Sequence, residues 1–256
     1  MIRTVTLIGS GNVAHNLGVA LQNKGLKVNE VFSRTKKNAK LLAEKLDANF
    51  IDELALLNQE SDLYIVASSD NSIAQIASQI RLKDKILVHT SGSVEMEVLR
   101  NSSNFVGCFY PLQTFTKDHQ TDFSEVPVCI ESNNEKTLSK LENLSQKLTA
   151  RTIHMSSIQR QKLHLAAVFV SNFVNYMQVI GQDLCKEQGV EFELLKPLIR
   201  EVFDKNELRT ARENQTGPAL RGDSFTMNRH LEILKKDKQL YKLYSLISDM
   251  IESRKF

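Results

Sequence analysis

The first half of the chain alternates short apolar segments with amphipathic ones. Apolar runs typical of β-strands occupy residues 2–8, 27–33, 62–67, 85–89, 104–109, 126–130 and 151–154. Between them, apolar side chains recur at helical spacing over residues 13–21, 36–46, 71–80 and 135–148. Strands that alternate with helices predict an α/β fold, in which a parallel, doubly wound sheet carries helices on both faces.

The pattern changes after about residue 155, where the strand signal ends and only helical spacing remains. Helices are expected over residues 157–188, 193–204, 207–213, 224–235 and 237–252, and Gly189 is a candidate cap for the end of the first of them. The sequence therefore predicts a Rossmann domain over residues 1–154 and a smaller all-helical domain over residues 155–256.

The long predicted helix, residues 157–188, is apolar on most of its faces. Its polar side chains form one narrow stripe of Arg160, His164, Ser171, Asn175, Gln178 and Gln182, with Asn172 at the edge. A helix that is apolar nearly all round is buried, so we expect it to pack in the interface of a homodimer. The stripe either brings His164 and Asn172 to a substrate or nicotinamide, or it is an interior hydrogen-bond ladder or a solvated face.

A glycine-rich turn joins the first strand to the first helix. Gly9, Ser10, Gly11, Asn12, Val13 and Ala14 match the dinucleotide-binding pattern G-x-G-x-x-A in its usual strand–turn–helix setting. The first glycine permits the tight turn, and the second lets a pyrophosphate approach the backbone. The helix N-terminus then offers free N–H donors and the positive end of its dipole.

The end of the second strand indicates which dinucleotide binds. NAD-binding proteins place a carboxylate there for the ribose hydroxyls, whereas this chain has Ser33, Arg34 and Thr35. These side chains offer charge-assisted donors to a 2′-phosphate, so the predicted cofactor is NADP. In the alternative interpretation, Arg34 and the following lysines only solvate a helix N-terminus, where cations are unfavourable without an anion.

Polar loops follow three further strands, at the sheet edge where α/β proteins bind ligands. The expected cofactor-binding residues in the first two loops are Ser68, Ser69, Asp70, Thr90, Ser91 and Gly92. In the third loop, Gln113 and Thr114 are expected to bind substrate. Asp70 has a second interpretation as a helix cap, and His89 as a buried structural histidine.

A turn in the helical part, residues 216–223, combines two glycines and a proline with two charged side chains. Arg221 has a planar donor fork that suits a substrate carboxylate or phosphate. Alternatively the segment is a fixed structural turn, in which Asp223 caps the next helix and pairs with Arg221.

Composition narrows the class of protein. Of the 256 residues, 41% are hydrophobic and 25% charged, and 33 basic against 30 acidic side chains give a net charge of +3, too small to indicate a nucleic-acid partner. The three cysteines lack disulfide or metal spacing, and no metal site is predicted. The strongest apolar run, residues 165–170, is too short to span a bilayer, and no signal peptide precedes the first strand. We therefore expect a cytoplasmic protein without a membrane partner.

Four motifs together resemble a known family. They are Gly9–Ala14, His89-Thr90-Ser91-Gly92-Ser93, Pro111-Leu112-Gln113-Thr114-Phe115 and Thr216–Asp223. This combination looks like the Rossmann-like family with the domain of unknown function 2520 at its C-terminal side, similar in plan to pyrroline-5-carboxylate reductase and 6-phosphogluconate-dehydrogenase-like enzymes. The resemblance implies an NADP-dependent oxidoreductase whose helical domain forms dimers and completes the active site. One departure concerns Tyr110, where the family often has histidine.

Two classes of function follow. In the favoured one, the chain transfers a hydride between NADP and a small carbonyl, imine or hydroxy compound, with His89, Tyr110 and His164 as candidate proton donors and Asn172 as a further catalytic candidate. In the other, the chain is a non-catalytic NADP-binding sensor. A methyltransferase is disfavoured, because the acid that would hold the ribose is missing after the second strand.

Overall fold

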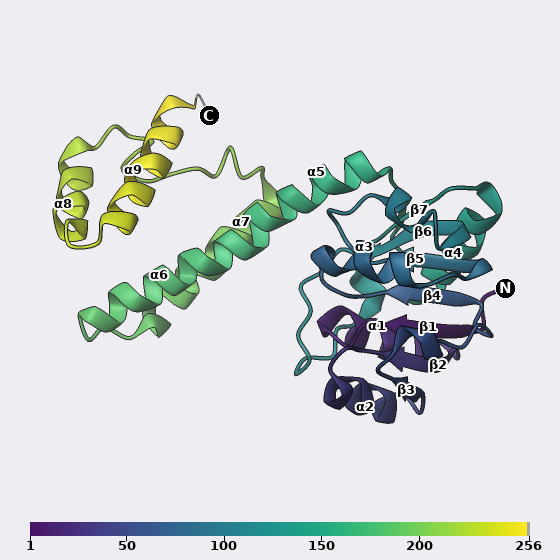
Figure 1. Ribbon diagram of the computed structural model, residues 1–256. Helices are drawn as coiled ribbons and strands as arrows, with labels where there is room; N and C mark the ends of the chain where they lie inside the picture. Colours follow the sequence, from purple (N-terminus) through teal and green to yellow (C-terminus); the bar gives the residue numbers. More distant parts are fainter. Residues whose placement is uncertain (255–256) are drawn as a thin grey trace. The chain divides into compact units, whose positions relative to one another are not determined.

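The structure, a computed structural model, describes residues 1–254 and contains one eight-stranded sheet in the order β3-β2-β1-β4-β5-β6-β7-β8 (Figure 1). The strands are β1 Thr4–Ile8, β2 Lys27–Phe32, β3 Asn49–Ile51, β4 Leu63–Val66, β5 Lys83–His89, β6 Ser103–Pro111, β7 Val128–Ser132 and β8 Thr152–His154. The helices between them are α1 Asn12–Asn23, α2 Lys36–Lys45, α3 Asp70–Gln79 and α4 Glu135–Leu148. This architecture confirms the predicted α/β Rossmann fold.

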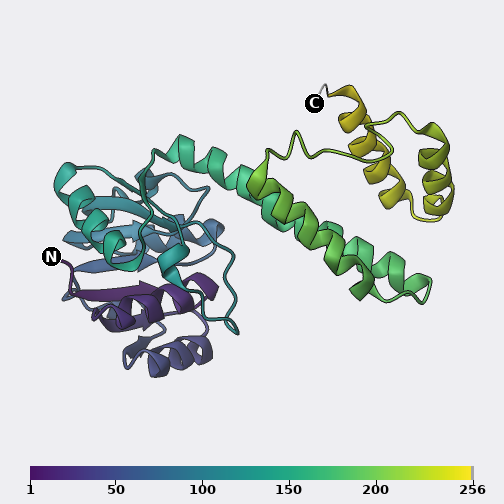
Figure 2. The same cartoon turned by 180° about the vertical axis from the view of Figure 1, so that it is seen from behind.

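Helices cover both faces of the sheet, as the two views show (Figures 1 and 2). Alternate residues of each strand point to opposite faces, so the central strands supply two cores. On one face, Leu7, Ile65 and Val88 pack with side chains of α1, α2 and α4. On the other, Tyr64 and Leu87 pack with side chains of α3. The sheet is thereby a rigid base that fixes the loops at its edge.

Three details of the predicted fold are corrected. Strand β7 runs antiparallel to β6, because the loop between them contains only a short 3₁₀ turn and no crossover helix. Strand β3 was missed, because it is only three residues long and Phe50, one of its two apolar side chains, is exposed. The helix expected over residues 207–213 is absent: α7 ends at Leu208 and turns follow.

The chain divides into two compact units after Tyr176. The predicted boundary lies at residues 154 and 155, so the structure keeps the start of the long helix with the Rossmann part. That helix is α5 Ser157–Ala167, a π-helical segment η4 Val168–Phe173, and α6 Val174–Glu187. The predicted cap at its end is confirmed, since Gly189 has a φ of +64°.

The second unit begins at Met177 within α6 and continues with η5 Phe192–Leu195, α7 Lys196–Leu208, α8 Ser224–Leu234 and α9 Lys238–Ser253. By length and composition, the continuous helix Ser157–Glu187 could cross a membrane, and no residue of its most apolar window is buried within the chain. Residues 165–170 alone therefore underestimate the length over which this helix is apolar. A helix covered by a second protein subunit meets the same criterion.

Candidate functional site

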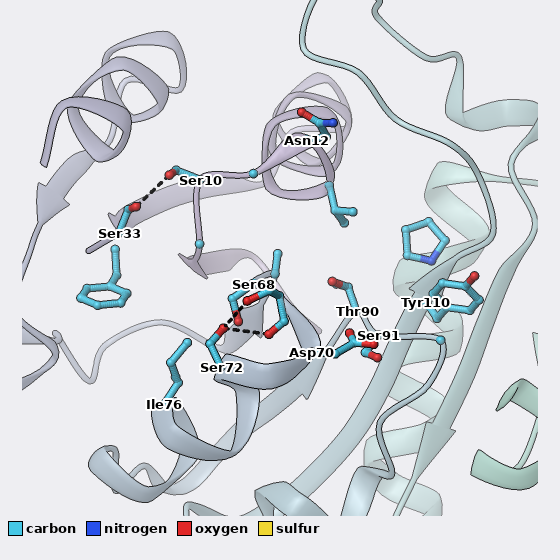
Figure 3. Close-up of a pocket in the computed structure, with 18 of the residues that line it drawn as sticks. Ser10, Asn12, Ser33, Ser68, Asp70, Ser72, Ile76, Thr90, Ser91 and Tyr110 are labelled. Carbon is cyan, nitrogen blue, oxygen red and sulfur yellow. Dashed lines mark hydrogen bonds between the residues drawn. The ribbon is translucent and has the colours of Figure 1, made fainter. Parts of the chain in front are cut away.

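A cavity of about 490 Å³ lies at the carboxyl ends of the central strands (Figure 3). Every residue predicted to bind the cofactor lines it: Gly9, Ser10, Gly11, Asn12, Val13, Ser33, Arg34, Thr35, Ser68, Ser69, Asp70, Thr90, Ser91 and Gly92. Tyr110, Gln113 and His164 line it as well. The structure thus gathers the carboxyl ends of five strands, β1, β2, β4, β5 and β6, and one helix at a single cleft.

The two glycines of the first turn are required for different reasons. Gly9 has a φ of +138°, and a Cβ atom on it would lie 2.1 Å from the carbonyl oxygen of Ala67. Gly11 has ordinary dihedrals and open space where a Cβ atom would be. Within the described residues no side chain caps α1, so its first N–H groups face the cavity unsatisfied. These features fit an approaching pyrophosphate.

Asn12 has a second role that the motif did not reveal. Its side-chain amide donates to the carbonyl oxygen of Phe115 at 2.8 Å, and the amide of Asn16 donates to Thr116 at 2.8 Å. These bonds fasten the loop after β6 across the start of α1. Asn16 is buried on the inner face of α1, a position at which the sequence gave no sign of a loop contact.

The end of β2 has the donors expected for a phosphate. The hydroxyl of Ser10 donates to that of Ser33 at 2.8 Å, which joins the first turn to the second strand (Figure 3). Arg34 is exposed and has no hydrogen-bond or ion-pair partner among residues 1–254. Lys36, in contrast, pairs with Asp52 at 3.3 Å. Of the basic group at this helix N-terminus, Arg34 is therefore the side chain left for an anion at the cavity.

A second cavity, of about 340 Å³, adjoins the first at this end and shares Phe32, Arg34, Ser72 and Ile76 with it. Five further residues line the first cavity but were not predicted from the sequence: Phe32, Ala67, Ser72, Ile76 and Pro111. Ile76 lies one and a half turns into α3, and its apolar periodicity is that of any core position, so the pattern carried no distinguishing signal.

The loop after β4 contributes hydroxyl groups and one carboxylate. Ser69 precedes the first residue of α3, so Asp70 lies in its first turn and not at the cap. Asp70 is exposed at the cavity wall. The hydroxyl of Ser68 is buried and has no partner within the described residues, which is costly unless a ligand supplies one.

His89 lies beneath the cavity and does not line it. Its ring is fully buried, its Nδ1 accepts from the backbone N–H of Ser91 at 3.2 Å, and Nε2 has no partner among the described residues. Burial, together with the positive charge of Arg160, lowers the pKa of His89 to about 4. The imidazole is therefore neutral at pH 7 and supports the loop that Thr90, Ser91 and Gly92 form.

Tyr110 and His164 meet at the cavity. The Tyr110 hydroxyl lies 3.0 Å from Nδ1 of His164, and the rings meet edge to face at 77°. Burial raises the pKa of Tyr110 to about 12, with smaller contributions from Cys129, Cys108 and Asp70. The phenol therefore keeps its proton across the physiological range.

A buried ion pair fixes α5 to the sheet. Nη1 of Arg160 donates to Glu131 of β7 at 2.5 Å, while Nε and Nη2 donate to the backbone carbonyls of Ser91 at 3.1 Å and Val94 at 2.6 Å. The Arg160 side chain is 1% exposed. The polar stripe includes Arg160, but its partner Glu131 is distant in sequence and could not be identified from the pattern.

Other predicted site residues lie outside the cavity wall. Thr114 is exposed, and its hydroxyl lies 3.2 Å from that of Ser171 in the π-helical segment. Asn172 is exposed in the same segment. Arg221 is exposed in the second unit, where Asp223 caps α8 by accepting from the N–H of Thr226 at 3.0 Å. This is the capping alternative that the sequence left open for Asp223.

Metal binding finds no matching arrangement in the described part of the chain. No group of three or more His, Cys, Asp or Glu side chains there could hold a metal ion. Residues 1–254 do contain the neutral and cationic donors that a dinucleotide phosphate requires, at the cavity described above.

Comparison with known proteins agrees with this geometry. The family model described as "NADP oxidoreductase coenzyme F420-dependent" matches residues 4–92, and the domain of unknown function 2520 matches residues 126–251. No curated protein matches the chain.

Solved structures extend the similarity over nearly the whole chain. The crystal structure of a "putative NADP oxidoreductase" from Bacteroides fragilis is 37% identical, covers 99% of both chains and has a TM-score of 0.93. An imine reductase from Myxococcus stipitatus in complex with NADP⁺ is 18% identical, with a TM-score of 0.66 over 98% of this chain and 92% of that one. A 1-pyrroline-5-carboxylate reductase from Streptococcus pyogenes is 11% identical, with a TM-score of 0.65 over 98% of each chain.

The last two similarities are low in identity and show the fold alone. The first, at 37% identity over 99% of both chains, shows the family. The chain belongs to the Rossmann-fold NADP oxidoreductase family that carries the domain of unknown function 2520 in its C-terminal part.

Proposed function

We propose that the chain is an NADP-dependent oxidoreductase that reduces a small carbonyl or imine compound or oxidises the corresponding hydroxy compound or amine. The observation that carries the proposal is the end of β2, where Arg34 is exposed at the cavity without a protein partner and Ser33 is held by Ser10. A carboxylate, which would favour the ribose of NAD, is missing there.

Each part of the cavity has a role in holding the cofactor. Gly11 and the N-terminus of α1 hold the pyrophosphate, and Ser33, Arg34 and Thr35 hold the 2′-phosphate. The adjoining cavity beside Arg34 and Ile76, which has both apolar and polar lining residues, offers a slot for the adenine ring. The unpartnered hydroxyl of Ser68 gains a hydrogen bond when ligand binds.

The opposite end of the cavity is suited to the chemistry. When bound, the nicotinamide supplies or accepts the hydride. Ser91 and Gly92 support the floor of that end, and Tyr110, Gln113 and His164 form its wall. The family's frequent histidine is Tyr110 here, so the polar group at that position is a phenol. Its hydroxyl and the His164 imidazole orient the substrate heteroatom.

The long helix Ser157–Glu187 supports a further proposal about assembly. We propose that its exposed apolar side chains pack against a second copy of the chain. Phe169, Phe173 and Tyr176 are 58%, 46% and 57% exposed within one chain, and apolar side chains that are exposed together mark an interaction surface. We also propose a cytoplasmic location, which the free cysteines support.

The first test is the choice of cofactor. NADPH and NADH are titrated against the protein and the enhancement of nicotinamide fluorescence is followed. We expect NADPH to bind more tightly, and Arg34→Ser to weaken NADPH about 10- to 100-fold with little change for NADH, since a charge-assisted hydrogen bond contributes about 1.5–3 kcal/mol.

Lys37→Ser is the matched control. It removes one exposed positive charge from the same helix N-terminus, but Lys37 does not line the cavity, so affinity for NADPH should hardly change. Equal or tighter binding of NADH by the wild type would overturn the assignment of NADP.

Turnover of NADPH distinguishes the oxidoreductase from the alternative, a non-catalytic NADP-binding sensor. NADPH oxidation is followed with a panel of keto acids, aldehydes and cyclic imines. Consumption of NADPH that depends on one class of compound supports the oxidoreductase and names its substrate class. Tight NADPH binding with complete inactivity across the panel would favour the non-catalytic sensor.

A further inference from the structure

The contact between Tyr110 and His164 joins two elements that are distant in sequence. Tyr110 lies near the end of β6 and His164 on the third turn of α5, and both line the cavity. The phenol oxygen is 3.0 Å from Nδ1, whereas Nε2 is not held by any described residue and the side chain is half-buried. One nitrogen of the imidazole thus faces the tyrosine, and the other is free to exchange protons with solvent.

We propose that Tyr110 and His164 form a two-step proton relay to the substrate, a role that rests on the proposed oxidoreductase function. As the substrate carbon accepts the hydride, the π electron pair of the C=O or C=N bond moves to the heteroatom. That heteroatom forms a bond to the hydroxyl proton of Tyr110. The phenol oxygen simultaneously takes the proton from Nδ1 of protonated His164, which becomes neutral and regains a proton from solvent. Oxidation reverses each transfer.

The surroundings of Tyr110 explain why two groups are needed. Its pKa of about 12, raised mainly by burial, makes a free phenolate unfavourable at pH 7. Cys108, two residues earlier on β6, and Cys129 on the adjacent β7 have raised pKa values and stay neutral, so the charged groups that act on the phenol are Asp70 and Arg160. A proton that leaves Tyr110 must therefore be replaced in the same step, and Nδ1 of His164 is the group within reach.

Neighbouring contacts fix the position of His164 relative to Tyr110. Arg160 and His164 are four residues apart and lie on the same face of α5, so the buried Arg160–Glu131 pair sets the position of the imidazole. Gly92 also positions the imidazole, because its backbone packs against the ring so closely that a Cβ atom there would lie 2.6 Å from Cγ of His164. A close backbone approach of this kind keeps the ring against Tyr110.

The state of the imidazole is measured without substrate. Histidine is labelled with ¹⁵N, the His164 signals are identified by their loss in His164→Gln, and their pH titration is followed by NMR. The relay requires that neutral His164 carries its proton on Nε2 and accepts from Tyr110 at Nδ1, and that Tyr110→Phe abolishes this preference. A neutral His164 protonated on Nδ1, or a titration unchanged by Tyr110→Phe, would overturn the relay.

Kinetics supply the second readout, with any compound that the wild type reduces. Tyr110→Phe and His164→Gln are expected to lower kcat about 100-fold or more while the Kd for NADPH stays within about threefold. Tyr64→Phe and His154→Gln are controls, since the Tyr64 hydroxyl donates to Asn58 and His154 pairs with Glu142 at the surface. Unchanged kcat in both relay variants contradicts the proposal.

The pH profile links the two measurements. The relay predicts that kcat for reduction falls as pH rises through the titration of His164 seen by NMR, because the neutral ring has no second proton to pass on. His164→Gln should remove that dependence. Loss of NADPH binding by the wild type would defeat the oxidoreductase proposal itself, whereas retained binding with a pH profile unrelated to His164 would defeat only the relay.

Discussion

The two units of this chain differ in where they keep their apolar side chains. The Rossmann unit buries them in two cores on the faces of its sheet, including Leu7, Tyr64 and Phe109. In the second unit, Ala219 is the one buried hydrophobic residue among those the structure describes, while Leu194, Leu198 and Phe225 are 70%, 62% and 72% exposed.

This difference separates two sources of stability. A sheet covered on both faces excludes water within one chain and holds its loops rigidly, which suits a binding site. A set of helices with apolar outer faces gains most of its hydrophobic free energy only when another surface covers it. We therefore expect the first unit to be stable by itself, and the second to depend on association.

The largest effect is expected from breaking the proposed association. Phe169 and Phe173 contact each other edge to face with ring centroids 5.0 Å apart on the exposed helix. Replacing both with Asp should weaken the dimer about 1000-fold, because buried charges there lack partners. Sedimentation velocity should then show a 29.0 kDa species in place of one twice that mass.

Leu56→Asp is the control for this comparison, because Leu56 is 61% exposed in the Rossmann part of the chain, outside the long helix for which association is proposed. It should leave the sedimentation coefficient unchanged. A wild type that sediments as a monomer at micromolar concentration would contradict the proposed role of the long helix.

The next effect separates stability from binding within the first unit. Gly9→Ala should lower the free energy of unfolding by about 3 kcal/mol or more, because the new Cβ atom meets the Ala67 carbonyl at a positive φ. Gly11→Ala should leave unfolding nearly unchanged but weaken NADPH at least about 10-fold, since the methyl group occupies open space beside the helix N-terminus.

Urea unfolding followed by circular dichroism, combined with NADPH titration, distinguishes these two variants. If Gly11→Ala unfolded at much lower urea than the wild type, or bound NADPH equally well, the separate roles assigned to the two glycines would be wrong.

A third effect depends on pH and concerns His89. Its folded pKa of about 4 lies below the usual value of 6.5, so the unfolded chain binds more protons between those values. The stability that neutral His89 contributes is therefore complete above about pH 6.5 and is lost as pH falls toward 4, on the order of 2–3 kcal/mol of it by pH 4.5.

Urea unfolding at pH 7.5 and pH 4.5 measures this loss, and hydrogen exchange locates it in the first unit. In His89→Gln, the difference between the two pH values should be smaller by that amount. An equal pH dependence in both proteins would show that His89 is not buried in its neutral form.

The smallest effect is a helix cap. The side chain of Asn134 accepts from the N–H of Thr137 at 2.9 Å at the start of α4. Asn134→Ala should lower the free energy of unfolding by about 1 kcal/mol. The sedimentation coefficient should not change, because this cap lies in the first unit, away from the long helix. A change in the association of the chain would contradict the separation of stability from association.

The sequence was sufficient for the parts of the site that follow from local chemistry. The turn at Gly9–Ala14, the basic end of β2 and the loops after β4 and β5 are each encoded within a few residues, and parallel strands bring them to one edge. The antiparallel β7 was not predicted, because strand direction depends on the path of a loop that has no pattern of its own.

Long-range contacts were beyond the sequence patterns for a physical reason. The partners of Arg160 are Glu131, Ser91 and Val94, and they are brought together only by the packing of α5 on the sheet. The stripe of polar residues indicated that Arg160 needed partners, but periodicity cannot identify them. For His89 the sequence left open a proton donor and a buried structural histidine, and its burial at the end of β5 agrees with the second interpretation.

A crystal structure of the chain with NADP⁺ tests the central claim most directly. The 2′-phosphate is predicted to lie within hydrogen-bonding distance of the Arg34 guanidinium and the Ser33 hydroxyl, with the pyrophosphate against Gly11 at the start of α1. Density for the adenosine end elsewhere, or an empty glycine-rich turn at saturating NADP⁺, would contradict it.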